Sequence, residues 1–421
     1  MSHHTISRPG HKITLYRRNN KFAPEDISQY IYAVNTSKRL GVAAGGFDLS
    51  AVHAEINDSG LPLHRYAKPM DVVLIELRGI EGVMEPVMVG LIMKPSREVK
   101  HNPQTGAFKY ACKVVGQDMG RMFMVHDCGW DLMRLDLYSG DAESIRQARM
   151  ATQGSFIQYS GTPAENINRA LAALFWPPLG DWVKKFISDQ AIVCKDDWVT
   201  WAKSITSRTG AMWNAMKAFA DEPWNVLFTD TNAKGMFEVR LEQAPFDVVT
   251  GKLSGIPIDK VSEAVIHGES LGLSDQDMIN FASFEAYAPL FGGDSFALMM
   301  TKQIKANDKL VAEYGFRAFK PQTEYVPWGD TKGPKPDMSA QIMARTEAIF
   351  NWHRRAHEYE SGSFEMAGST SKKIFRGLII PERNMQFFVE GVRHVYSNSG
   401  SKVSYVTTLD VTRGQEHEQE L

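Results

Sequence analysis

The chain has 421 residues, 43% of them hydrophobic and 23% charged. At roughly 150 residues per domain this length predicts about two to four folded domains, and the composition excludes a disordered or fibrous chain. Lys and Arg number 47 against 49 Asp and Glu, so no strong field would concentrate nucleic acid or anionic lipid on the surface, which argues against a dedicated DNA-binding protein.

The three cysteines, Cys112, Cys128 and Cys194, form no C-x-x-C pair. This spacing argues against a disulfide framework or a thiolate metal site, and it fits synthesis in a reducing cytoplasm. No apolar run approaches the roughly 18 residues of a membrane-spanning helix, so neither a signal peptide nor a membrane segment is expected.

Residues 1–118 predict a first β domain, a small barrel or sandwich. Apolar residues alternate with polar ones in short runs, turn residues separate the runs, and the helical period is mostly missing. The strongest strand patterns lie at 13–17, 70–77, 87–93 and 108–115.

Residues 119–220 predict a mainly helical insert domain. Thr162, Pro163 and Glu165 supply an N-cap, a proline at the first helical position and the glutamate of a capping box, so a helix is expected to begin there. Apolar residues at helical spacing occur in three groups: Ile167, Leu171, Leu174 and Phe175; Trp198, Trp201 and Ile205; and Met212, Met216 and Phe219.

The β pattern returns at 225–229 and 235–241, which predict a hairpin. Residues 221–252 and 360–414 together predict a second β domain, interrupted at 253–359 by a mixed α/β domain that ends in a helix from about Ser339. Within 360–414, strands are expected at 374–380, 386–396 and 403–412, and the last two should pair antiparallel. Residues 415–421 lack an apolar pattern and predict a flexible tail.

Gly268 to Gly272 match G-x-S-x-G, the turn that exposes a nucleophilic serine in α/β-hydrolases. A serine hydrolase using Ser270, with a histidine such as His353 as base, is therefore one hypothesis. The context argues against it, because a nucleophile elbow follows a buried strand, whereas Ile258, Val261 and Val265 are spaced as in a helix.

Metal and cofactor motifs are weak. His353 and His357 stand four residues apart on the predicted helix and would face one ion, but no third ligand follows at a fixed spacing. Residues 230–241 resemble a calcium loop only in part, because Lys234 occupies a ligand position and Leu241 replaces the bidentate glutamate. No phosphate loop or dinucleotide fingerprint occurs, so no catalytic residue, metal or cofactor is expected.

The second half of the chain contains several short motifs in a fixed order. They are WNVLF at 224–228, FEVR at 237–240, APFD at 244–247, YGFR at 314–317, GSFEMAG at 362–368, FVEGV at 388–392 and YVTTLDVTRG at 405–414. In this order they resemble the baseplate hub proteins of phage tails, which join the tail tube to the central spike, and the hub half of type VI secretion spike proteins.

The resemblance implies a β-rich α+β fold in which two tube-protein-like β-barrels accompany the helical insert and the mixed α/β domain. Three subunits with two barrels each would form a pseudo-six-fold ring that matches a hexameric tail tube. The residues expected to form the structural strands of the second barrel are Phe388, Val392, Val403, Tyr405, Thr407, Leu409 and Val411.

The resemblance also implies a structural virion protein rather than an enzyme, at the centre of the tail baseplate after assembly in the host cytoplasm. Its expected partners are two further copies of itself, a separate spike protein, the tail tube or tube initiator, the tape measure protein and surrounding baseplate proteins, with DNA only as passing cargo. Besides the serine hydrolase, another tail ring protein, such as a tube or distal tail protein, is an alternative.

Overall fold

The structure is a computed structural model. It describes residues 8–101, 108–127, 156–176, 179–188, 201–206, 210–220, 222–247, 249–287, 302–319, 322–324, 326–327 and 338–417.

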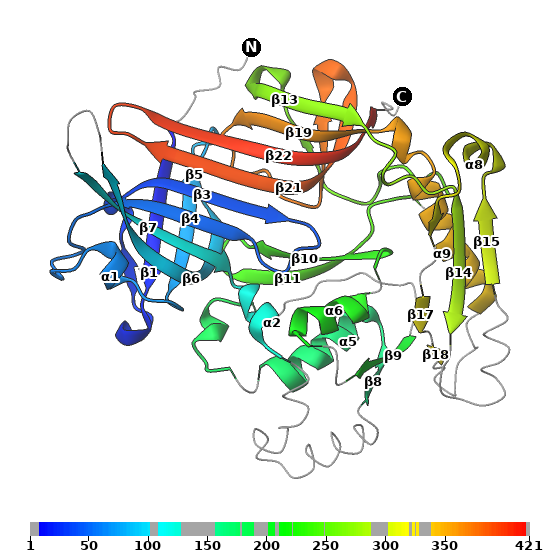
Figure 1. Cartoon of the computed structure of the whole chain (residues 1–421), viewed down its shortest axis with the longest axis horizontal. Coiled ribbons are helices and arrows are strands. Elements are labelled where there is room, and N and C mark those ends of the chain that lie inside the picture. The colour runs from blue at the N-terminus through cyan, green and yellow to red at the C-terminus, as the bar shows by residue number, and fades with distance from the viewer. Residues whose placement is uncertain are drawn as a thin grey trace, which may run out of the picture.

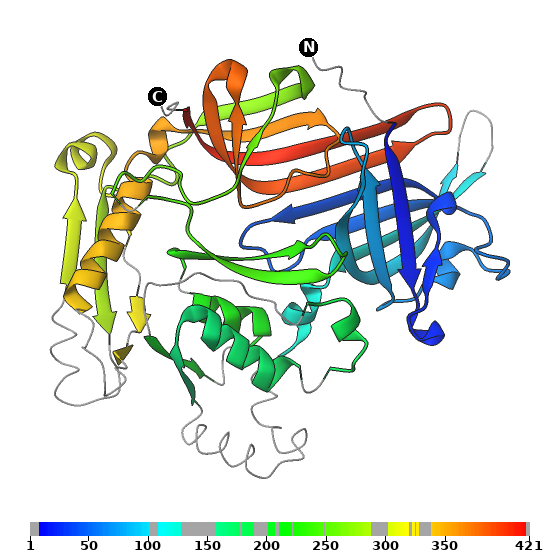
Figure 2. The same cartoon turned by 180° about the vertical axis from the view of Figure 1, so that it is seen from behind.

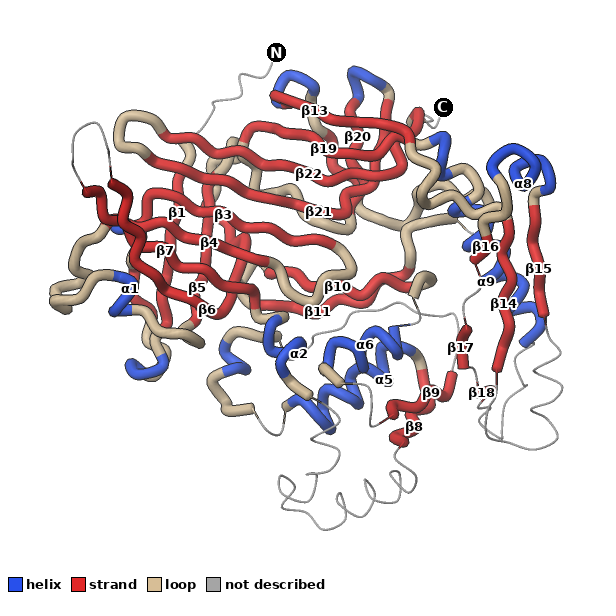
Figure 3. The backbone as a smooth tube through the Cα atoms, viewed as in Figure 1, coloured by secondary structure: helices blue, strands red, loops and turns tan. Residues whose placement is uncertain are grey.

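Within these residues, most of the strands from the two terminal regions join in a single sheet of thirteen strands (Figures 1 and 3). All neighbours are antiparallel except β12 and β20. From one edge to the other the main path runs through β13 (Ile266–Leu273), β19 (Glu360–Ala367), β22 (Val403–Glu416), β21 (Met385–Asn398), β3 (Ile31–Arg39), β4 (Gly46–Val52), β7 (Phe108–Asp118), β6 (Met84–His101), β5 (Val72–Arg78), β1 (Gly10–Tyr16) and β2 (Pro24–Asp26). Beside this path, β20 (Arg376–Ile380) pairs with β21, and β12 (Ile258–Lys260) pairs with β20.

The expected β-rich α+β fold is confirmed, but the expectation of two barrels is corrected. No ladder among the described residues closes a barrel, and β13 and β2 end the main path. Instead, β3 of the N-terminal region pairs with β21 of the C-terminal region, from Arg39 opposite Gly391 to Ala33 opposite Ser397. The pairing of β3 with β21 is called the seam here. An alternating pattern predicts which face of a strand is buried but not which strand it pairs with, so the seam was not predictable from the pattern.

The N-terminal part of the sheet curls over on itself. β1 and β5 lie behind β3 and β4 in Figure 1 and in front of them in Figure 2. Apolar side chains from both layers fill the space between, including Leu15 of β1, Ile75 of β5 and Leu49 of β4, each completely buried. Inward-facing and outward-facing residues alternate along these strands, and the corresponding alternation of apolar and polar residues in the sequence predicted a β region.

The predicted hairpin is confirmed as β10 (Asn225–Thr231) and β11 (Phe237–Gln243), a two-stranded sheet of its own. Asn232 closes its turn by accepting hydrogen bonds from the amides of Lys234 and Met236, in keeping with a turn rather than a calcium loop. Because side chains alternate along β10, Leu227 packs in the core of the insert helices while Phe228 packs in the core of the C-terminal strands. The hairpin therefore connects the two cores.

The insert contains the expected helices, and also strands. Thr162 and Glu165 form the predicted capping box at the start of α5 (Pro163–Ala170), which a π-helical turn (Leu171–Phe175) continues. The other helices are α2 (Arg121–Val125) and α6 (Met212–Ala220). Figure 2 shows this layer beneath β10 and β11.

The helix expected around Trp201 and Ile205 is wrong. These residues lie in β9 (Trp201–Thr206), which pairs with β8 (Phe156–Gly161) and β18 (Val326–Pro327). Trp198 lies outside the described residues. A short apolar run spaced by three and four residues fits a helix or a strand about equally well, and here pairing with β8 decides it.

The mixed α/β region contributes a small sheet of four strands with a helix along it (Figure 1). The sheet consists of β14 (Phe281–Tyr287), β15 (Lys302–Ala306), β16 (Ala318–Phe319) and β17 (Gln322–Glu324). The helices are α8 (Asp308–Tyr314) and α9 (Met338–His353), the latter near its expected start.

The helical spacing read at 258–265 is wrong. β12 and a 3₁₀ turn (Glu263–Val265) occupy that segment. Pairing of β12 with β20, residues more than a hundred positions away in the chain, overrides the local pattern.

The predicted pairing of the last two strands is confirmed over β21 and β22. The predicted start of a flexible tail at residue 415 is wrong, because β22 continues to Glu416, which pairs with Met385. His417 still donates its amide to the carbonyl of Asn384 at 2.8 Å, and residues 418–421 lie outside the described residues. No helix in the described parts of the chain has the length and apolarity needed to cross a bilayer.

Candidate functional site at the seam of the sheet

The residues expected to build the second barrel all lie on β21 and β22, next to the seam. Six of them are buried and Val403 is half-buried at the end of its strand. Phe388, Val392, Leu409 and Val411 pack in the C-terminal core, whereas Tyr405 packs in the N-terminal core. The two strands thus contribute to both cores.

A buried polar cluster lies on the inner side of the seam. The hydroxyl of Tyr405 is 2.9 Å from Nδ1 of His394, and the hydroxyl of Thr407 is 3.3 Å from the same nitrogen. The backbone amide of Ser369 donates to the Thr407 hydroxyl at 2.9 Å. Burial, with a smaller contribution from the charge of Lys38, lowers the pKa of His394 to about 4, so this ring is neutral at neutral pH.

Charged groups attach the hairpin β10–β11 to both sides of the seam. The ammonium group of Lys38, on β3, lies 2.9 Å from the hydroxyl of Thr231 and 3.5 Å from the carboxylate of Asp230. Lys373, in the segment before β20, lies 3.7 Å from the other oxygen of Asp230. These side chains border a cavity of about 30 Å³, a volume that can hold ordered water.

The carboxylate of Asp118, at the end of β7, is completely buried. It accepts hydrogen bonds of 2.9 Å from the amides of Gly45 and Gly120. Burial raises the pKa of Asp118 to about 6, although Lys38 and the two amides act in the opposite direction. This carboxylate fixes the loop before β4 against the end of β7.

The tip of the β5–β6 hairpin docks on the C-terminal half. Glu81 accepts hydrogen bonds from the hydroxyls of Ser369 and Ser371, and Ile80 donates its amide to the carbonyl of Gly368 at 2.8 Å. Burial would raise the pKa of Glu81, but the hydrogen bonds to the serines outweigh it and the pKa is lowered. The backbones approach so closely that a Cβ at Gly79 would lie 2.4 Å from the Gly368 oxygen.

The opposite side of the seam is a continuous surface of small and polar side chains across four strands, called the seam face here. Its rows follow from the register, because directly opposed residues point to the same side of a sheet. The first row is Arg393, Ser37, Gly46 and Gln117; the second is Val395, Asn35, Asp48 and Val115; the third is Ser397, Ala33, Ser50 and Lys113.

The seam face points away from the N-terminal core and contains a groove of about 460 Å³. Asn35 donates a hydrogen bond of 3.1 Å to Asp48 within it. Arg393, Lys113 and Asp48 are the only charged groups of the three rows, so the surface is polar with little net charge.

Ser270 and His353, the candidate hydrolase residues, have other partners than each other. Ser270 lies on the edge strand β13, opposite Ser363 of β19, and not after a buried strand as an elbow requires. His353 directs Nδ1 at the carbonyl of Asp277, 2.9 Å away. Burial and the charge of Arg413 lower the pKa of His353 to about 4.

The shared helix expected for His353 and His357 is also wrong. α9 ends at His353, and His357 lies in a separate 3₁₀ turn (Ala356–Glu358). The two rings therefore lack the one-turn spacing that a pair of metal ligands on a helix uses. His357 packs against the ring of Tyr314.

Solved structures similar to this fold include two tail proteins. The tail protein from Neisseria meningitidis MC58 has a TM-score of 0.53 and 12% identity, over 96% of this chain and 97% of that chain. The 43 kDa tail protein of prophage MuSo2 from Shewanella oneidensis has a TM-score of 0.53 and 11% identity, over 96% and 98%. A Francisella PdpA-VgrG complex matches at a TM-score of 0.45 and 8% identity, over 99% of this chain and 55% of that chain.

No protein-family model and no curated protein matches the sequence. At 11 to 12% identity the likeness to tail proteins establishes the fold. The resemblance read from the ordered motifs is therefore confirmed for the fold: this chain has the fold of phage tail proteins over nearly its whole length.

Sequence reasoning missed the seam face. Its only local signal is the polar half of each alternating strand, for example Ala33, Asn35 and Ser37, and such residues look like any solvated strand face. What makes them one surface is the pairing of β3 with β21, which links residues far apart in the chain.

Proposed function

We propose that the chain is a structural subunit of a phage tail baseplate hub. Three copies form a closed ring that joins the hexameric tail tube to a central spike, and the ring forms part of the channel through which DNA leaves the particle. Closed cyclic symmetry is the usual state of such assemblies, because it leaves no open end for further addition.

The observation that carries the proposal is the single sheet formed by both terminal regions across the seam. A subunit that presents two β regions side by side would offer two strand sets, so three subunits would supply six, the number that a six-fold tube requires. The tail-protein fold over nearly the whole chain supports the same reading.

In this proposal the seam face lines the channel. A conduit for DNA has to let phosphates slide past without binding them, and each lysine or arginine that neutralises a phosphate adds affinity. The seam face carries two cations, Arg393 and Lys113, and one anion, Asp48, among twelve positions. Its low charge fits transient passage.

The proposed partners are a separate spike protein, the tail tube or tube initiator, the tape measure protein and the surrounding baseplate proteins. The proposed location is the centre of the tail baseplate, reached after assembly in the host cytoplasm. The chain would act through its shape, without catalytic residues or a cofactor.

Mass measurement in solution and imaging of the tail test this proposal together. The expected result is a trimer, seen at the junction of tube and spike in the particle. A stable hexamer would favour the alternative of a tube or distal tail protein, since rings of those proteins are usually hexameric.

Substitutions on the seam face test its position. Val395→Lys adds a cation to the seam face and should leave subunit folding and ring formation intact while reducing DNA delivery. Val83→Lys, at an exposed hairpin position away from the seam face, is the matched control. Equal infectivity of the two variants would show that the seam face does not line the channel.

The hydrolase alternative is tested with Ser270→Ala and His353→Ala. Purified protein should be inactive on ester and peptidoglycan substrates, and both variants should assemble as the parent does. Substrate turnover that falls more than tenfold in a folded Ser270→Ala variant would restore the enzyme hypothesis.

A further inference from the structure

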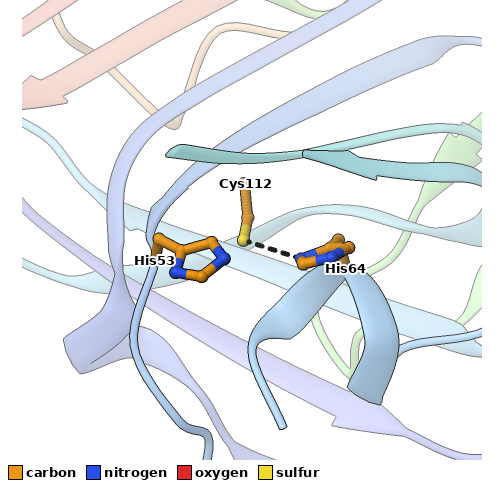
Figure 4. Close-up of side chains that lie close together, drawn as sticks. All are labelled: His53, His64 and Cys112. Atoms are coloured by element: carbon orange, nitrogen blue, oxygen red, sulfur yellow. Dashed lines mark hydrogen bonds between the residues drawn. The ribbon is translucent and has the colours of Figure 1, made fainter. Parts of the chain in front are cut away.

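Three side chains with the chemistry of metal ligands meet at one end of the N-terminal β region. They are His53, His64 and Cys112, and their ligand atoms all lie within 4.8 Å of one another. Figure 4 shows the two rings on either side of the thiol.

Each ligand comes from a different element. His53 directly follows β4, His64 lies in the short helix α1 (Leu63–Tyr66), and Cys112 is on β7. The register of β4 against β7 pairs Ala51 with Cys112, which brings the end of β4 next to the thiol. The fold thus assembles the cluster from local sequence and strand pairing together.

The distances suit an ion with tetrahedral ligands. Nδ1 of His64 lies 3.4 Å from Sγ of Cys112. Zinc bonds of about 2.3 Å to sulfur and about 2.1 Å to nitrogen would separate these atoms by roughly 3.6 Å in a tetrahedron. The rings of His53 and His64 stack with centroids 5.6 Å apart, and the ligand atoms of all three side chains lie within 4.8 Å of one another.

The environment fits a bound cation with one open position. Cys112 is buried with 1% exposure, His64 is half-buried and His53 is exposed. A buried thiol beside two imidazoles can lose its proton to a bound metal, and a fourth position toward solvent is left for water.

We propose that His53, His64 and Cys112 form a binding site for a divalent transition metal ion of the zinc type. Two imidazoles and one thiolate are the soft and borderline ligands that Zn²⁺ and Co²⁺ accept, whereas Ca²⁺ and Mg²⁺ require oxygen. The ion would tie α1 and the loop 53–62 to the β4–β7 pair, and so stabilise this corner of the sheet. It would bind whether or not the chain assembles into a ring.

Co²⁺ is the probe, because a cobalt–thiolate bond gives a charge-transfer absorption that an imidazole or carboxylate site lacks. The titration uses the full chain with Cys128→Ser, Cys194→Ser, His3→Ala and His4→Ala. These changes remove the cysteines and histidines that lie outside the described residues, and they leave Cys112 as the only thiol. We expect one Co²⁺ per chain with the thiolate band, displaced by one Zn²⁺, and a Zn²⁺-dependent rise in melting temperature.

Single variants in this background identify the ligands. Cys112→Ser should abolish the thiolate band, and His64→Asn and His53→Asn should each weaken Zn²⁺ binding by more than about tenfold, since even the loss of a ligand's hydrogen-bond partner costs 10–100-fold. His267→Asn, at an exposed position on β13, is the control and should bind as the background does.

His53→Asn keeps the test decisive if Cys112→Ser fails to fold, because His53 is exposed and its loss disturbs no core. Absence of the thiolate band in the folded background protein would overturn the proposal, and so would undiminished Zn²⁺ binding in both histidine variants. Either result would leave the thiol of Cys112 as a hydrogen-bonded partner of His64 only.

Discussion

The hydroxyl of Tyr405 lies 2.9 Å from Nδ1 of His394, at a place where both side chains are buried beside the seam. In the neutral ring Nδ1 accepts this hydrogen bond, whereas in the protonated ring it would donate to the hydroxyl oxygen. Burial therefore decides the charge state, and it favours the neutral form of His394.

Acid should weaken the fold through His394. Its pKa is about 4 in the folded chain against about 6.5 unfolded, so the unfolded chain binds a proton first and stability falls as the pH drops from 6.5 to 4, by at most about 3 kcal/mol. Asp118, whose folded pKa is raised to about 6, contributes with the opposite sign in an overlapping window. The informative quantity is therefore the difference between wild type and His394→Gln at each pH.

We expect His394→Gln to be less stable than wild type at pH 7 and to approach or exceed it at pH 4. Urea denaturation across this range measures the gap, and His267→Gln, a change at an exposed ring, is the control. A gap for His394→Gln that stays constant with pH would contradict the assignment.

Gly368→Ala should destabilise the seam. A Cβ there would lie 2.1 Å from Cγ of the Tyr405 ring, and overpacking of this kind costs about 1–3 kcal/mol or more. Gly272→Ala is the matched control, because its Cβ meets nothing within 4 Å. The urea concentration at the midpoint of unfolding is measured for both variants. Equal midpoints would show that the Tyr405 ring moves aside without loss of stability.

Glu81→Ala should loosen the contact between the β5–β6 hairpin and the segment after β19. The carboxylate is exposed at one side, so the loss is expected near 1 kcal/mol rather than the full value of a buried charged hydrogen bond. Faster amide hydrogen exchange confined to residues 79–83 and 368–371 is the expected readout. Glu365→Ala, on the exposed side of β19, should leave these amides unchanged.

Truncation separates the end of β22 from the residues beyond it. A chain that ends after His417 keeps every pair of β22 with β21 and should fold as the full chain does. A chain that ends after Ser401 loses the whole of β22, including the fully buried Leu409 and Thr407, and should be insoluble. Equal soluble yields would mean that β22 is dispensable.

The sequence was informative wherever structure depends on near neighbours. Thr162 and Glu165 predicted the start of α5 because a capping box is complete within four residues. The alternation from Val403 to Thr412 predicted a strand, and the turn before it predicted the partner. Pairing between segments far apart in the chain was not predicted, because no residue near β3 indicates that its partner is β21.

The same limit applies to the sites. The strands β21 and β22 were predicted because both segments are rich in apolar residues at strand spacing and a turn separates them. The cluster of His53, His64 and Cys112 was not predicted, because the three residues share no fixed spacing in the sequence. The absence of a C-x-x-C pair even argued against a thiolate site. Their proximity arises from the β4–β7 ladder and from α1, which only the folded chain contains.

The pairing of β3 with β21 also sets an order of events during synthesis. About 350 residues separate Arg39 from Gly391, and at 5–20 residues per second a ribosome needs roughly 20 to 70 s to make them. Throughout that interval the edge of β3 has no native partner, and an unpaired edge is a template for association with other chains. The nascent chain is therefore open to such association until β21 has been made.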